Sequence, residues 1–355
     1  MAGAGSDAME RLERFRRLAT TGLGALELSG HDPSEELLRE IYGILDDEIA
    51  ESLRSGGLFA SQAFLQDRLD AFNEAWGGTA FRILALPGSD LMVGAFQLSP
   101  KGSGNSIRIY RQSGSVAGLV SAIHREGVPR LHEMPTTRAG DPQFLVAWVG
   151  PQSSRENTGL RLELWRRRGE SVTLAWSADA LVDGGLLVSQ FSWGAEELSF
   201  RYELRYPGWK PGCAGQTEQE DFYRYVAARE TFVLTRRRVH NGWHREFHRG
   251  LARFLSALNT KDDRALAGVV GDEALRRRLP ARLEADLVCD EAEGSPPNTV
   301  SVAAVEPPGT RAGHPGEGVG PVGGRPWTLV FRRTRDGWRL AAAAPVEPFS
   351  AKMTR

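Results

Sequence analysis

Residues 198–206 read Leu-Ser-Phe-Arg-Tyr-Glu-Leu-Arg-Tyr, and this stretch decides the fold class. Its apolar and aromatic side chains alternate with polar ones, which is the period of a β-strand with one buried face. Residues 187–193 carry a similar pattern and end just before Gly194-Ala195. The two stretches therefore predict an antiparallel hairpin.

The same period recurs through residues 79–240. We expect a first hairpin around Pro87-Gly88, a central strand over 144–149 and further strands beyond it. Residues 115–126 are expected to form a short helix. Short strands joined by short turns predict an antiparallel meander, either a sandwich or an open barrel, and argue against a parallel nucleotide-binding sheet. Four tryptophans of this region are expected to pack one common core: Trp148, Trp165, Trp176 and Trp193.

Residues 1–78 are predicted to be helical. Asp32-Pro33 is a typical start signal, because aspartate caps the first turn and proline suits the first helical position. Apolar side chains then recur every four residues from Leu37 to Ile49. Residues 1–80 hold 15 acidic and 7 basic residues, against 30 and 37 in the rest of the chain. We expect the acidic helices to dock on an arginine-rich face of their own chain or of a neighbour.

Residues 241–349 predict a small α+β domain after the β domain. A helix begins at Trp243 and presents one apolar face through Leu258. A closing hairpin turns at Asp336-Gly337. Segment 307–326 is rich in glycine and proline and predicts a flexible loop.

This last domain resembles the NTF2-like (SnoaL-type) superfamily. The similarity rests on the helix from Phe247 to Leu258, the turn Asn259-Thr-Lys-Asp-Asp, the short helix from Arg264 and the closing hairpin. The resemblance implies a curved antiparallel sheet that wraps the helices into a cone, with a pocket that binds small molecules or hosts simple acid–base chemistry. It covers the C-terminal domain only and carries over no catalytic residue.

The composition excludes several classes of protein. The 355-residue chain has 44 basic and 45 acidic residues, which argues against a strongly basic nucleic-acid binder. It has neither a run of about 18 apolar residues, as a membrane-spanning helix needs, nor an apolar leader, so we expect no integral membrane segment and, by default, a cytoplasmic location. Cys213 and Cys289 are too few for a cysteine-only metal centre. Two unrelated thiols are the simpler interpretation, whereas a Cys213–Cys289 disulfide would indicate a periplasmic or other extracytoplasmic location.

The most unusual stretch for binding chemistry is 206–225, which glycine and proline shape into a loop. Aromatic side chains beside carboxylates suit a sugar or a cationic ligand. The alternative is an ordered connector whose tryptophan packs and whose carboxylates begin a helix. The candidate ligand-binding residues in this stretch are Trp209, Gln216, Glu218, Glu220 and Tyr223.

Three histidines, His240, His244 and His248, recur every four residues at the start of the last domain. Two histidines on one helix face could hold a divalent metal, but no carboxylate completes such a site. Asn241-Gly242 is expected to start the helix after His240. We therefore expect two partly exposed helix histidines and no metal. Trp243, His244 and His248 are the candidates for the mouth of a small-molecule pocket.

The motifs of nucleotide binding, dinucleotide binding and α/β-hydrolase chemistry are missing from the sequence. We accordingly predict no catalytic residue and no cofactor. The expected function is that of a non-enzymatic binding or assembly protein, a subunit or accessory factor of a bacterial complex. The expected partner is another protein or further copies of the chain, and not nucleic acid. The alternative is a small-molecule enzyme, or a carbohydrate or ligand binder, that uses the C-terminal pocket and the 206–225 loop.

Overall fold

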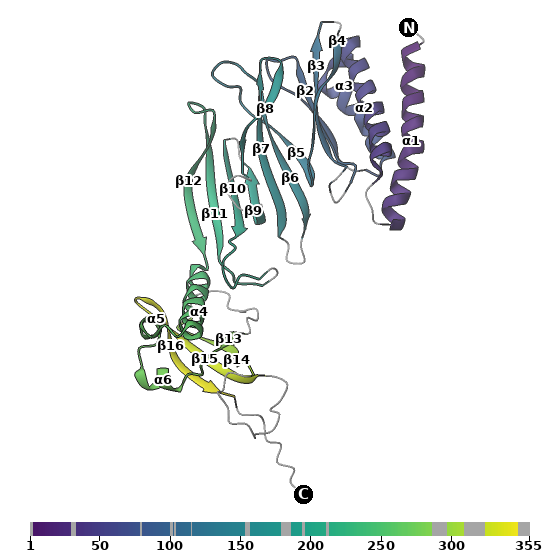
Figure 1. Ribbon diagram of the computed structural model, residues 1–355. Helices are drawn as coiled ribbons and strands as arrows, with labels where there is room; N and C mark the ends of the chain where they lie inside the picture. Colours follow the sequence, from purple (N-terminus) through teal and green to yellow (C-terminus); the bar gives the residue numbers. More distant parts are fainter. Residues whose placement is uncertain are drawn as a thin grey trace. The chain divides into compact units, whose positions relative to one another are not determined.

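The chain divides into two compact units. The N-terminal unit comprises Met1–Tyr202 and Asp221–Arg236, and the C-terminal unit comprises Glu203–Glu220 and Arg237–Arg355. Figure 1 shows an α+β protein with helices at the start of the chain and antiparallel sheets after them. The computed structural model describes residues 3–29, 33–78, 80–99, 102, 104–114, 116–152, 157–178, 186–193, 196–210, 213–285, 297–308 and 324–346.

The predicted helices at the start of the chain are confirmed. They are α1 (Gly3–Ser29), α2 (Glu35–Ser55) and α3 (Gln62–Ala75), with the short 3₁₀ helix η1 (Gly57–Ala60) between the last two. Helix α2 begins later than the predicted start, because Ser34 is its N-cap and accepts a hydrogen bond from the Leu37 amide. Asp32 lies outside the described residues.

Four strands in chain order form an antiparallel sheet, sheet A: β1 (Phe81–Ala85), β2 (Leu91–Phe96), β3 (Ser106–Ser113) and β4 (Val116–His124). The helices cover one face of this sheet (Figure 1) through an apolar core that includes Phe15, Trp76 and Phe96. Arg108 on β3 is paired with Asp46 on α2 inside this contact. Within this unit the acidic helices thus dock through apolar packing and one buried ion pair rather than on an arginine-rich face.

Strand β4 contradicts the prediction of a short helix over residues 115–126. Its apolar residues Val116, Leu119, Val120 and Ile123 are spaced three and four apart, as on one face of a helix. The segment nevertheless pairs along its length with β3. In a strand this spacing places apolar side chains on both faces, so Ile123 is buried while the other three remain exposed.

The predicted β meander forms a larger antiparallel sheet, sheet B, whose first and last strands stay apart, so it is not a closed barrel. Its order is β12-β11-β10-β9-β7-β6-β5, and β8 pairs with the far half of β7. The strands are β5 (Val128–Glu133), β6 (Gln143–Gln152), β7 (Thr158–Arg168), β8 (Ser171–Ser177), β9 (Leu186–Trp193), β10 (Glu197–Glu203), β11 (Glu218–Val226) and β12 (Thr231–His240). The predicted hairpin is the β9–β10 pair, but β10 ends at Glu203, so residues 204–206 do not continue the strand as predicted.

Sheets A and B pack face to face, but the four tryptophans do not share one core. Trp148 and Trp165 belong to the apolar layer between the sheets. Trp176 and Trp193 instead both contact Phe232 on β12. The tryptophan spacings of 17, 11 and 17 residues do not reveal this division, because a bulge at Ala175 in the β7–β8 pairing places Trp176 opposite Leu164.

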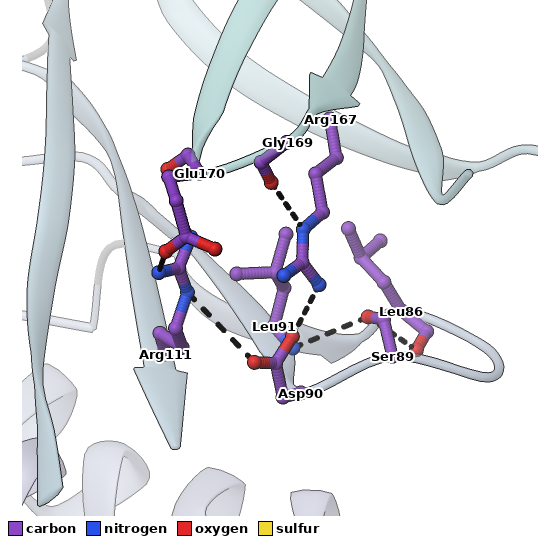
Figure 2. A network of polar contacts seen from close by, with 8 residues as sticks. All are labelled: Leu86, Ser89, Asp90, Leu91, Arg111, Arg167, Gly169 and Glu170. Atoms are coloured by element: carbon purple, nitrogen blue, oxygen red, sulfur yellow. Dashed lines mark hydrogen bonds and ion pairs between the residues drawn. The ribbon is translucent and has the colours of Figure 1, made fainter. Parts of the chain in front are cut away.

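A polar network joins the two sheets at one end (Figure 2). Asp90, in the turn before β2, is paired with Arg167 at the end of β7 and lies 3.8 Å from Arg111 on β3. Arg111 is also paired with Glu170 and donates to its backbone carbonyl at 2.8 Å. These contacts connect the β1–β2 turn of sheet A with the β7–β8 turn of sheet B.

The C-terminal unit combines helices with an antiparallel sheet. Its helices are α4 (Gly242–Thr260), α5 (Asp263–Val269) and α6 (Glu273–Arg278). Its antiparallel sheet, sheet C, contains β13 (Glu284–Ala285), β14 (Thr299–Glu306), β15 (Arg325–Thr334) and β16 (Gly337–Pro345) in chain order. One face of α4 packs on this sheet, and Phe247, Phe254 and Phe331 are fully buried between them.

Two further expectations concern this part of the chain. Segment 307–326 is predicted to be a loop, but Arg325 and Pro326 already belong to β15, and residues 309–323 lie outside the described part.

Among the helices that the structure describes, none is long and apolar enough to cross a membrane.

Candidate functional site

Residues 203–210 and 213–217 fold over the first turns of α4 within the C-terminal unit. The Thr217 hydroxyl donates to the Asn241 carbonyl at 2.7 Å and accepts from the Arg245 amide at 3.0 Å. Asn241 has a left-handed backbone and makes no side-chain cap of its own. Thr217 therefore satisfies one of the free amides at the start of α4 and fixes the loop to the helix.

The loop brings Tyr206 onto the histidine face of α4. The Tyr206 hydroxyl lies 2.6 Å from Nδ1 of His244 and accepts a hydrogen bond from the Thr217 amide at 3.1 Å. The tyrosine hydroxyl and Nδ1 share one hydrogen bond, and the histidine tautomer decides which of the two groups donates it. Burial raises the pKa of Tyr206, which keeps the phenol protonated.

The expectation of partly exposed helix histidines is wrong. His244 and His248 are only 3% and 4% exposed, and their ring centroids lie 4.3 Å apart. The loop covers both, because Gly208 lies against the His248 ring with no side chain between them. As predicted, α4 starts after His240, whose Nε2 is 3.0 Å from a Glu220 carboxylate oxygen.

Other predicted residues of the 206–225 stretch hold the loop itself together. The Trp209 indole donates to the Glu203 carboxylate at 2.9 Å. The buried Gln216 amide accepts from the Lys210 amide and donates to the carbonyls of Lys210 and Cys213. Glu218 lies on β11 and is half-buried. Nothing in these contacts tests ligand binding, which for these residues stays a prediction.

Trp243 and Tyr223 lie in two different cores. Trp243 is buried on α4 beside Trp338 in the C-terminal unit, and neither indole N–H has a hydrogen-bond partner among the described residues. Tyr223 is buried on β11 in the N-terminal unit, where its ring stacks on Phe200. The predicted binding residues are therefore divided between the two units.

The predicted link between Cys213 and Cys289 stays a prediction, because Cys289 lies outside the described residues while Cys213 is buried. If the bridge forms, iodoacetamide modifies neither cysteine when the chain is unfolded in urea without a reductant. After reduction it modifies both. Mass spectrometry of the intact protein reads the result. Modification of both thiols without reduction would exclude the disulfide. It would also end the argument for an oxidising compartment.

A groove on the N-terminal unit is a second candidate site. Its volume is about 650 Å³, and it lies over strands β9 to β12. Tyr223 is the one predicted site residue that lines it. The buried positions of these strands predict the strands themselves, and the same alternation marks the outward positions that line the groove. The outward lining residues are Ser192, Glu197, Ser199, Phe222, Arg224 and Arg236.

The groove side chains are held by contacts across neighbouring strands. Ser192 and Ser199 lie opposite each other in the β9–β10 register with hydroxyl oxygens 2.7 Å apart. Arg224 Nε donates to Glu197 at 2.9 Å. The Arg236 guanidinium lies 3.7 Å from the ring centroid of Phe222, a close cation–π contact. The groove thus presents hydroxyls, both signs of charge and an aromatic ring on a hydrogen-bonded framework.

The described residues contain no group of three or more His, Cys, Asp or Glu side chains that could hold a metal ion. Comparison with known proteins assigns no relative: no model of a protein family matches the chain, and no curated protein matches it either. The case for function therefore rests on the geometry of the groove and of the histidine cluster.

Proposed function

We propose that this chain is a non-enzymatic binding or assembly protein, and that the groove over β9–β12 holds an extended segment of a protein partner. The observation that carries the proposal is the groove itself, a shaped surface of mixed chemistry on four adjacent strands. Its rigid strands supply a binding surface that needs little ordering when a partner arrives.

The composition of the groove favours a protein as its occupant. Arginine and aromatic side chains are enriched where proteins meet, and Arg236 over Phe222 provides both in one contact. The paired Ser192 and Ser199 hydroxyls offer hydrogen bonds to a peptide backbone. One glutamate and two arginines line the groove, and Glu197 is paired with Arg224, so the lining carries a single net positive charge, which is little for a polyanion such as nucleic acid.

Native mass spectrometry of the full chain, tagged and purified from the cells that make it, tests this function. We expect a protein partner to accompany the wild type and the control Arg168→Glu, which changes an exposed strand arginine outside the groove. Arg236→Glu removes the contact with Phe222 and reverses the charge, so recovery of the partner is expected to fall about tenfold or more. A chain without any other protein, or a partner that Arg236→Glu and the control retain equally, would contradict the proposal.

The histidine cluster favours a second candidate, a small-molecule enzyme in the C-terminal unit. The Tyr206 hydroxyl and His244 form a hydrogen-bonded pair that could pass a proton to or from a substrate. The packing of α4 on sheet C is also the arrangement that the proposed NTF2-like relationship requires. This candidate needs a route from solvent to two buried rings, and ligand-induced shifts of the His244 and His248 NMR signals in a metabolite screen would support it.

A further inference from the structure

Arg236 is the charged side chain of the groove that has no charged partner among the described residues. The charged residues that line the groove are Glu197, Arg224 and Arg236. Glu197 is paired with Arg224, and the negative charge of Glu196 also acts on Arg224. Within the described part of the chain, Arg236 contacts the ring of Phe222 and no carboxylate. One positive charge at the groove is therefore left for an occupant to neutralise.

Phe222 holds the Arg236 guanidinium at the surface of the groove. The guanidinium carbon lies 3.7 Å from the ring centroid. The Thr235 hydroxyl donates to the Phe222 carbonyl at 3.0 Å, which ties β12 to β11 beside this contact. The ring attracts the positive charge but supplies no oxygen acceptor to the N–H donors of the guanidinium. The cation is thus positioned in advance, with donors that an occupant can use.

A single row of side chains crosses the groove from a pair of hydroxyls to this cation. Ser192 on β9 faces Ser199 on β10. The Tyr225 amide on β11 donates to the Glu196 carbonyl at 2.8 Å. Counting along the two antiparallel strands from this bond places Phe222 opposite Ser199. The guanidinium from β12 lies over the Phe222 ring and completes the row.

We propose that the partner segment held by this groove is acidic at one position, where an aspartate or glutamate side chain binds Arg236. This inference rests on the proposed function and adds the chemistry of the occupant. A carboxylate accepts two parallel hydrogen bonds from a guanidinium, and arginine keeps this ability when it stacks on an aromatic ring. Neighbouring strands lie about 4.8 Å apart, so the serine hydroxyls are about 5–10 Å along the row, within reach of the backbone of the same extended segment.

A carboxylate fits this cation better than the alternatives do. A phosphate group carries about two negative charges and is recognised by clusters of arginines, whereas the other arginine that lines the groove, Arg224, is already paired with Glu197. A basic segment would bring a like charge to Arg236. An uncharged apolar segment would cover the guanidinium donors without an acceptor, which costs free energy.

Panning of a random peptide library, displayed on phage, against the full chain tests the inference. The wild type is expected to select peptides with aspartate or glutamate at one fixed position. Arg236→Glu is expected to select lysine or arginine at that position, because the charge that it presents is reversed. The control Arg168→Glu changes an exposed strand arginine outside the groove and is expected to select the same peptides as the wild type.

Fluorescence anisotropy with a selected peptide then measures the contact itself. Replacing the acidic residue of the peptide by its amide is expected to weaken binding to the wild type about tenfold, because a charged hydrogen-bonded pair is lost. The same replacement is expected to leave binding to Arg236→Gln unchanged, since that variant already lacks the contact. Ser199→Ala is expected to weaken binding of the acid and amide peptides alike.

The outcomes separate this inference from the function on which it rests. Peptides that bind Ser199→Ala more weakly, yet bind the wild type equally well as acid and as amide, would overturn the acidic position and leave the groove as a binding surface. Peptides that bind the wild type, Ser199→Ala and Arg236→Glu equally would overturn both, and so would a library that yields no binder to the wild type.

Discussion

Replacing Arg108 by methionine is expected to lower the free energy of unfolding of the N-terminal unit by about 3–5 kcal/mol, because it leaves a largely buried carboxylate without its ionic partner. Arg108 is 6% exposed and donates from Nε to Asp46 at 2.7 Å. The Tyr110 hydroxyl donates to the same carboxylate at 2.8 Å, and burial together with that negative charge raises the pKa of Tyr110. Methionine fills much of the space of arginine but supplies none of these bonds.

Urea denaturation followed by circular dichroism measures the change against a matched control. Arg14→Met removes the same kind of side chain from an exposed pair with Glu40, and its expected effect is about 0–1 kcal/mol. The double variant Arg108→Met with Asp46→Leu removes both charges and is expected to recover much of the stability. Equal losses for Arg108→Met and Arg14→Met would show that the buried pair does not hold α2 to sheet A.

This pair also shows what the sequence could and could not predict. The helices, the hairpin around Pro87-Gly88 and the strand that begins at Leu198 follow from local periodicity, and the structure contains them, although this strand ends at Glu203 and not at Tyr206. The contact between Asp46 and Arg108 joins residues 62 positions apart in sequence. Charge counting placed acidic residues in the helices, but it could not tell which single arginine would be buried beside which carboxylate, because burial is decided by tertiary packing.

The prediction of a helix at β4 was wrong for the opposite reason, because the local periodicity of this segment is clear but is that of a helix. Val116, Leu119 and Val120 repeat at the spacing of a helix, and only the pairing with β3 makes the segment a strand. The same mismatch leaves apolar side chains on the exposed edge. Local periodicity and final structure disagree in this segment, and the exposure of Val116, Leu119 and Val120 is the consequence.

The sequence predicted the shared helix face of the two histidines but not their burial. The four-residue spacing correctly put His244 and His248 on one face of α4. Their burial depends on residues 204–210 and 213–217, which follow β10 in the chain and belong to the C-terminal unit. Tyr206 lies within the stretch singled out from the sequence, yet no local pattern relates its hydroxyl to a ring 38 residues later.

Replacing Gly208 by alanine is expected to lift this loop from α4 and to lower the free energy of unfolding of the C-terminal unit by about 2–4 kcal/mol. Gly208 has a φ of +91°, where an L side chain is strained. A Cβ there would lie 2.1 Å from Nδ1 of His248, whose ring is confined by His244 and Phe247. Because these neighbours confine the ring, we expect the loop to move away from α4 instead.

Gly337→Ala is the matched control for the Gly208→Ala variant. Gly337 also has a positive φ, +110°, but a Cβ there meets nothing within 4 Å, so only the backbone strain of about 1–2 kcal/mol is expected. Modification of the native chain by diethyl pyrocarbonate, with peptide mapping, reports the loop directly. In Gly208→Ala, His244 and His248 are expected to react readily, whereas in the wild type and in Gly337→Ala they are expected to stay protected. If the two alanine variants lose equal stability and protect both histidines equally, the loop is not what buries the cluster, and access to these rings must be controlled from the α4 side.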